Sequence, residues 1–223
     1  GWYDRLNARL HLQRSNTDNR ARQQRSNTSA SCSAVVGSGN DCRVEQDFFF
    51  EQTAVGGGVQ IDKALGERQL LVFGVDLLRV RTEELRDARV WNLTSGTFSK
   101  SLAGDTHPVR DFAPGYTDTA GVFVQDEITD LVGGRLTLVA GLRYDWRRLA
   151  PQVDALSQDV LDRIGRSAVA QTDGAVSPKL AASLQLAPTV SAHAQVVRGF
   201  RAPDYEEVNG HFRNVVQSYG ITP

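Results

Sequence analysis

Residues 135–147 read RLTLVAGLRYDWR, and this stretch decides the fold class. Apolar and polar side chains alternate through it, and the apolar positions are Leu136, Leu138, Ala140, Leu142, Tyr144 and Trp146. A period of two residues predicts a β-strand with one apolar and one polar face. The stretch is longer than the ~5–6 residues of a typical globular strand. It is long enough for the ~9–11 residues with which a tilted strand crosses a bilayer.

The same alternation recurs along the chain, at residues 5–14, 52–62, 69–83, 116–128, 176–186 and 190–198. In the first of these segments Leu10 and Leu12 interleave with Arg9, His11 and Gln13. The sequence therefore predicts about seven strands and an all-β fold. Residues 153–164 have some helical spacing but lie within a long connection.

Long and short connections alternate between these strands. The long ones are residues 15–47, 85–115 and 149–175, and the short ones are residues 63–68, 129–134 and 187–189. Strict alternation predicts antiparallel neighbours with all long loops at one end, which is typical of outer-membrane β-barrels. Loops above ~12–15 residues are uncommon in compact soluble domains. The pattern favours an antiparallel transmembrane β-barrel fragment of about seven strands, with the aromatic residues at 48–50, 144 and 146 at the membrane interfaces.

Composition excludes several classes of protein. With 25 Lys+Arg against 26 Asp+Glu in 223 residues, the net charge of −1 argues against a nucleic-acid-binding module. Hydrophobic content of 40% with 23% charged residues is far from that of a disordered chain. No apolar run approaches the ~18–20 residues of a membrane helix. The chain has no methionine, from which we expect a processed product or a piece of a longer protein.

Four segments resemble one family in order and spacing. They read FVQDEI at 123–128, LRYD at 142–145, SPKL at 177–180 and GFRAPDYEEVN at 199–209. Together they resemble the barrel of TonB-dependent outer-membrane receptors, in the branch that takes up haem and haemoglobin. The FRAP box of that family is matched by Phe200, Arg201, Ala202 and Pro203. The resemblance covers residues 116–223 well, and residues 1–115 mainly through the strand and loop pattern.

The resemblance implies a site, a cargo and partners. A histidine follows the FRAP box in the family, and His211 stands there as the expected axial ligand of haem iron; Tyr205 and Tyr219 would stack on the porphyrin or ligate it weakly. A solvent-exposed loop histidine is the alternative for His211. Haem or haemoglobin is then the transported ligand, with no intrinsic cofactor. The implied partners are outer-membrane lipid of a Gram-negative cell and the TonB complex, reached through a plug domain.

The resemblance also implies a larger protein than residues 1–223. Seven strands are about a third of the ~22 that such plugged transporters use. We therefore expect the whole chain to be a partial receptor barrel domain, with the plug domain and the remaining strands absent.

Several other residues allow structural roles. Cys32 and Cys42 lie ten residues apart and could form a disulfide or remain two thiols. Pro203 would end a strand, and Arg201 could pair with Asp204, Glu206 or Glu207. The glycines at 56–58 suggest a bend or close packing in the sheet rather than a phosphate loop.

No legible catalytic or zinc-binding arrangement supports an enzyme. Two rival functions remain: a ferric-siderophore receptor of the same superfamily, which should lack a histidine after FRAP, and a soluble β-rich binding domain.

Overall fold

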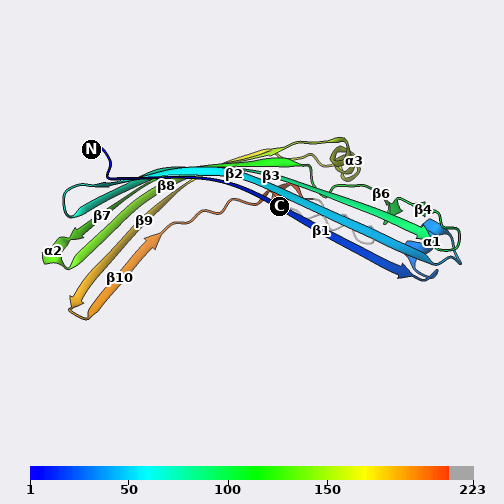
Figure 1. Cartoon of the computed structure of the whole chain (residues 1–223), viewed down its shortest axis with the longest axis horizontal. Helices are drawn as coiled ribbons and strands as arrows, with labels where there is room; N and C mark the ends of the chain where they lie inside the picture. The colour runs from blue at the N-terminus through cyan, green and yellow to red at the C-terminus, as the bar shows by residue number, and fades with distance from the viewer. Residues whose placement is uncertain (211–223) are drawn as a thin grey trace.

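The computed structural model of this chain describes residues 1–210. Within that range the main sheet has eight strands, seven of them in the order β1-β2-β3-β7-β8-β9-β10, with β4 paired to β3 off this path. The seven are β1 (Arg5–Arg25), β2 (Cys42–Ala64), β3 (Gln69–Asn92), β7 (Gly115–Asp130), β8 (Leu136–Pro151), β9 (Gln171–Ala187) and β10 (Val190–Val197). All neighbours are antiparallel. The sheet bends into a half-barrel (Figure 1), which confirms the predicted all-β barrel fragment.

The connections separate by length, as predicted. Short turns join β2 to β3, β7 to β8 and β9 to β10 at one end of the sheet, and the long connections lie at the other end (Figure 1). The remaining elements are α1 (Ala30–Val36), β4 (Phe98–Ser99), β5 (Ser101–Leu102), β6 (Asp105–Thr106), α2 (Leu131–Gly134), α3 (Ala155–Ile164) and α4 (Tyr205–Asn209). Among the described helices, none is long and apolar enough to cross a bilayer.

The pairing register gives the sheet two chemically different faces, because side chains opposite one another across strands share a face. One row aligns Leu10, Gly57, Leu77, Ala120 and Trp146, and we call this side the outer face. The adjacent row aligns Arg9, Gly58, Asp76, Gly121 and Asp145, and we call that side the luminal face. The alternation read from the sequence is therefore the alternation between the two faces.

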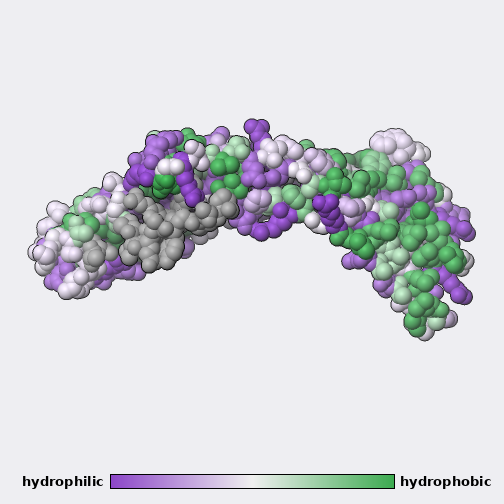
Figure 2. All heavy atoms as spheres, turned by 180° about the vertical axis from the view of Figure 1, so that it is seen from behind, coloured by the Kyte–Doolittle hydropathy of each residue, from purple (hydrophilic) through white to green (hydrophobic). Residues whose placement is uncertain are grey.

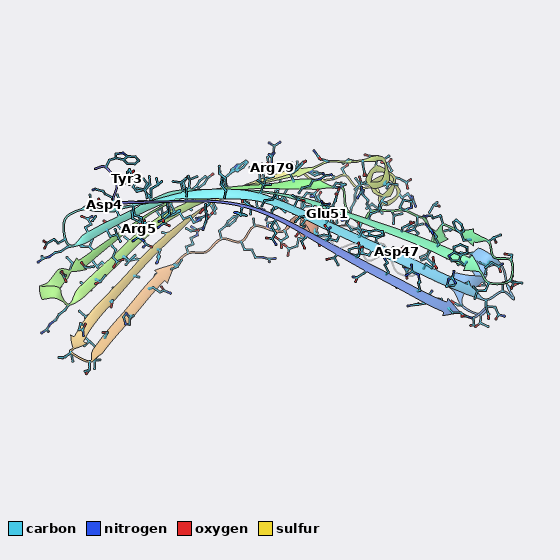
Figure 3. The ribbon with its side chains drawn as sticks, viewed as in Figure 1. Tyr3, Asp4, Arg5, Asp47, Glu51 and Arg79 are labelled. Atoms are coloured by element: carbon cyan, nitrogen blue, oxygen red, sulfur yellow. A yellow bond between two sulfur atoms is a disulfide. The ribbon has the colours of Figure 1, made fainter. Side chains whose placement is uncertain are left out.

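Charged residues limit the apolar band of the outer face. Toward the long loops, Arg79 donates to Asp118 at 2.6 Å, and its guanidinium lies 5.3 Å from the Tyr116 ring centre. Toward the short turns, Gln69 donates to Asp126 at 2.7 Å. The two aspartates lie eight positions apart in β7, which at ~3.4 Å per residue and a tilt of ~40° corresponds to a band ~20 Å tall. Figure 3 shows Arg79 on the convex side of the sheet.

Hydrophobic residues gather toward the end of the short turns, and hydrophilic residues dominate toward the end of the long loops (Figure 2). The explanation is that the strands continue far beyond the apolar band on the loop side. Residues 15–25 and 42–47 were predicted as loop but belong to β1 and β2, and β3 runs on to Asn92. Their outer face is mostly polar, and the apolar residues Val44, Ala88 and Val90 lie on the luminal face. The ladder of backbone hydrogen bonds therefore continues where the apolar outer face ends.

Two aromatic predictions are corrected by the register. Phe48 and Phe50 align with the luminal residues Arg86 and Glu84, so only Phe49 lies on the outer face. Their rings stack on the luminal face, 6.5 Å apart. Tyr144 and Trp146, in contrast, lie on the outer face as predicted, in register with Val122 and Ala120.

Two small cores cover the luminal face at the loop end. In the first, α1 and β5 pack over strand residues; its members are Cys32, Cys42, Val44, Ala88, Val90 and Leu102. In the second, Phe112, Leu149 and Tyr205 pack together, with Phe50 and Val208 beside them. The long connections therefore fold inward over the strand ends instead of standing away from them.

Candidate functional site at the loop end of the luminal face

The middle of the luminal face carries a chain of ion pairs across three strands. Arg9 of β1 donates to Asp76 of β3 at 2.6 Å, and Asp76 also accepts from Arg143 of β8 at 3.2 Å. Arg143 in turn donates to Asp145 at 2.8 Å. Gly121 makes this possible, because a Cβ there would collide with the Arg143 guanidinium. A trough of about 430 Å³ is lined by Arg9, Asp76 and Arg143 of this chain of charges, and also by Phe123, Gln125 and Lys179.

The FRAP segment begins where β10 ends at Val197. Phe200 is 44% exposed, and Arg201 pairs with Glu207 at 2.5 Å, one of the three carboxylates predicted for it. The Glu207 carboxylate also accepts from the Asp204 N–H at 2.7 Å, which caps α4. The hydrogen bond from the Asp204 N–H, and to a smaller extent that from Arg201, lowers the pKa of the Glu207 carboxyl. The Arg201–Glu207 ion pair is therefore charged at neutral pH.

Tyr205 anchors the start of α4 and does not face outward. Its side chain is 4% exposed, its hydroxyl donates to the Ala113 carbonyl at 2.8 Å, and its ring meets Phe112 edge-on at 5.8 Å. Burial raises the pKa of the phenol. The predicted contact of Tyr205 with a porphyrin is therefore corrected, since ring and hydroxyl are both occupied inside a core. Gly115 leaves the space for this ring, because a Cβ there would collide with it.

Two further contacts fix the FRAP segment to its surroundings. Arg147 of β8 donates to the Pro203 carbonyl and lies 3.7 Å from the Asp204 carboxylate. Asn209, at the end of α4, accepts from the Val169 N–H at 2.8 Å and donates to the Val169 carbonyl at 3.1 Å. The segment from 203 to 209 is therefore held by β8 and by the connection before β9.

His211 and Tyr219 lie outside the described residues, and their roles stay predictions. Of the other histidines, His11 and His193 lie on the luminal face, as their positions in the alternation predicted. The His107 Nδ1 lies 3.4 Å from the Arg86 carbonyl. Among residues 1–210, no group of three or more His, Cys, Asp and Glu side chains could hold a metal ion.

Sequence reasoning missed a cavity of about 540 Å³ on the luminal face at the loop end. Its walls include Asn19, Gln46, Phe48, Arg86, His107 and Asp111. Arg86 pairs with Asp111 at 2.9 Å, and the Asp111 N–H donates to the fully buried Glu84 at 2.7 Å. Only the length of the connection after residue 85 hinted at this site, because it forms when that connection folds back over β2 and β3.

The loop between β1 and β2 is closed covalently. The sulfur atoms of Cys32 and Cys42 are bonded, with their Cα atoms 5.5 Å apart. Both cysteines are fully buried in the core under α1. The disulfide therefore ties the tip of the β1–β2 hairpin to the sheet.

Comparisons with known proteins agree with this architecture. The family described as "TonB dependent receptor-like, beta-barrel" matches residues 1–223. No curated protein sequence matches the chain. The copper transporter OprC superposes with a TM-score of 0.52 at 15% identity, covering 86% of this chain and 30% of OprC. BauA, the ferric preacinetobactin receptor from Acinetobacter baumannii, superposes with a TM-score of 0.44 at 13% identity, covering 93% of this chain and 30% of BauA.

The chain belongs to the TonB-dependent receptor β-barrel family. Members of this family are outer-membrane transporters, not enzymes, and they bind TonB and carry ligands such as metals or siderophores. The likeness to OprC shows the fold alone, because the identity is only 15%. The chain spans 30% of the length of either solved structure, and neither comparison assigns haem to it as a cargo.

Proposed function

We propose that this chain forms part of a receptor that binds haem or a haem protein at its extracellular loops for TonB-dependent uptake. The observation that carries the proposal is the order SPKL at 177–180, FRAP at 200–203 and then His211. Neutral imidazole is a good ligand for haem iron. Copper, siderophore and haem receptors share the barrel, so the loop histidine is the feature that favours haem.

The residues just before this histidine are held firmly in place, which supports the proposal. Tyr205, Arg147 and Asn209 fasten residues 203–209 to the barrel wall and to neighbouring connections. The last described residue, Gly210, donates its N–H to the Glu206 carbonyl at 2.7 Å. A ligand placed directly after such an anchored helix loses less conformational freedom on binding haem than one in a free loop.

Titration of the complete receptor in detergent with hemin tests the proposal. We expect a shifted Soret band with saturable binding, and a loss of affinity of at least tenfold in His211→Ala. His193→Ala, which removes a luminal histidine from β10, is the matched control and should bind hemin as the wild type does. Unchanged hemin affinity in His211→Ala would contradict the ligand role. Absence of hemin binding together with saturable binding of a ferric siderophore would instead support the siderophore alternative.

A further inference from the structure

A buried carboxyl group lies beneath the connection between β3 and β7 (residues 93–114). Glu84 of β3 is 2% exposed and faces the lumen, five positions beyond Arg79 on the loop side and therefore outside the apolar band. Its Oε2 accepts from the Asp111 N–H at 2.7 Å, whereas its Oε1 is buried with no hydrogen-bond partner among residues 1–210. An ionised carboxylate is unfavourable in such a place, because burial removes solvent and only one oxygen accepts a hydrogen bond from the protein.

Positive charges lie near Glu84 but are bound by other acceptors. Arg86 pairs with Asp111 at 2.9 Å. Arg110 pairs with Asp154 at 2.7 Å and also donates to the Glu84 backbone carbonyl. Burial raises the pKa of the Glu84 carboxyl to about 7, and the charge of Asp111 adds to this rise. The hydrogen bond from the Asp111 N–H and the charges of the two arginines act in the opposite direction without cancelling it.

The other elements around Glu84 contribute groups whose charge stays constant near neutral pH. β2 places the uncharged Phe50 opposite Glu84 in the register, and Tyr205 of α4 packs against Phe50. Burial raises the pKa of the Tyr205 phenol, so this group stays neutral. Asp154 of α3 is held by Arg110, and despite its burial the hydrogen bonds it accepts keep the pKa of its carboxyl below the ordinary value.

The connection that docks on Glu84 forms one wall of the luminal cavity of about 540 Å³. His107 and Asp111 of the connection line this cavity together with Arg86 of β3. Two backbone hydrogen bonds of 2.9 Å between Arg86 and Val109 join the connection to the strand, beside the bond from Asp111 to Glu84. A change in the charge of Glu84 therefore acts directly at the base of the cavity wall.

We propose that Glu84 is a pH-sensitive switch that controls whether this connection is docked on β3. With Glu84 neutral, the connection is docked and the luminal cavity keeps its wall. Ionisation of Glu84 places a buried negative charge beside that of Asp111, so the connection opens and the carboxylate becomes hydrated. The switch does not involve His211, so it operates whichever cargo the receptor carries.

The direction of the pH dependence follows from the raised pKa of Glu84. Below the ordinary value of 4.5 the carboxyl is protonated in both the docked and the open form. Between pH 4.5 and about pH 7 only the open form releases the proton, so docking weakens as the pH rises and the loss is complete above about pH 7.

Hydrogen exchange of the complete receptor in detergent tests the switch, with the amides of His107, Val109 and Asp111 as the readout. The ratio of protection in the wild type to protection in Glu84→Gln cancels both the intrinsic pH dependence of exchange and any titration of His107. We expect this ratio to fall about tenfold or more between pH ~5 and pH ~8, because a difference in proton affinity between two forms changes their equilibrium by the same factor. Glu83→Gln is the matched control, since Glu83 is the neighbouring residue and pairs with Arg81 on the outer face. It should show the same fall as the wild type.

A second variant tests the switch without changing Glu84. Asp111→Asn keeps the backbone N–H and removes the negative charge beside the carboxyl, so protection of the His107 and Val109 amides should fall less with rising pH than in the wild type. Equal falls in Asp111→Asn and the wild type would overturn the proposal. So would a ratio of wild type to Glu84→Gln that stays constant over the same pH range. Loss of the fall in Glu83→Gln would also overturn it, because the effect would then come from the overall charge of the loop end.

Discussion

The Tyr205 hydroxyl joins two connections that are far apart in the chain. It donates to the Ala113 carbonyl at 2.8 Å across 92 residues of sequence, and the Pro114 carbonyl lies 3.2 Å away. Burial raises the pKa of this phenol, so the proton needed for the hydrogen bond stays in place throughout the physiological pH range. One hydroxyl therefore holds the base of the FRAP segment against the connection that precedes β7.

Tyr205→Phe keeps the ring and removes that hydrogen bond. We expect the packing of α4 against the connection before β7 to lose about 1 kcal/mol of stability, because the buried Ala113 carbonyl loses a hydrogen-bond donor. Hydrogen exchange of residues 110–115 in the complete receptor should then rise about fivefold. Tyr3→Phe, at the opposite end of the sheet (Figure 3), is the control and should leave exchange in that segment unchanged. An unchanged exchange rate in Tyr205→Phe would show that the hydroxyl does not hold residues 110–115 in place.

At the scale of the element, α3 shows how a connection at the loop end is held. Asp154 caps the helix by accepting from the Ser157 N–H at 2.9 Å, and Arg110 donates to the same carboxylate at 2.7 Å. Burial opposes ionisation of Asp154, but the bonds from Ser157 and Arg110 outweigh it and lower the pKa of the carboxyl below its ordinary 3.8. The cap is therefore strongest in the charged form.

The stability that Asp154 contributes should depend on pH in one direction. Since its pKa is lower folded than unfolded, the contribution is complete above pH ~4 and is lost as pH falls through the lowered value. Asp154→Asn keeps a capping oxygen without a titrating group. We expect protection of the amides of α3 against hydrogen exchange to fall below pH ~4 in the wild type relative to Asp154→Asn. A constant ratio of the two protections between pH 2 and pH 6, a range that brackets the ordinary carboxyl values, would contradict this role.

The same scale shows how far the sequence predicts the structure. The alternation found all seven long strands, because in the apolar band Leu10, Leu77 and Trp146 face one way and Arg9, Asp76 and Asp145 the other. It could not find the strand extensions, because their outer face is mostly polar. The helical spacing of residues 153–164 agrees with α3 (Ala155–Ile164).

The candidate site was less accessible to sequence analysis. Arg201 had a carboxylate within six positions, and the pair with Glu207 formed as predicted. The position of Tyr205, in contrast, depends on Phe112 and Ala113, which lie 92 or more residues earlier and reach it only when the connection before β7 is folded. The cavity beside His107 also depends on long-range folding, since its walls come from β1, β2, β3 and that same connection.

For the whole molecule, the open edges of the sheet decide its behaviour outside a membrane. Within the described residues β1 and β10 each have one neighbour, so each leaves a row of unpaired backbone groups. The outer face adds exposed apolar side chains across all the long strands. Such a sheet has no core that could bury the apolar outer face or the unpaired backbone groups of the edge strands.

We therefore expect residues 1–223, expressed alone, to aggregate in buffer without detergent. Light scattering after size-exclusion chromatography measures this, and the same chain in detergent micelles is the comparison. A detergent-free monomer with a cooperative unfolding transition would contradict the expectation and would favour the soluble β-rich domain as an alternative.

The length of the β1–β2 hairpin also sets how far this part of the chain projects beyond the membrane. Beyond Arg14 the strand continues for 11 residues to Arg25, which at ~3.4 Å per residue and a tilt of ~40° raises its tip ~28 Å above the apolar band. The headgroup layer occupies only ~5–8 Å of that height. Residues 26–41 therefore stand clear of the lipid surface, where an antibody can reach them on an intact cell.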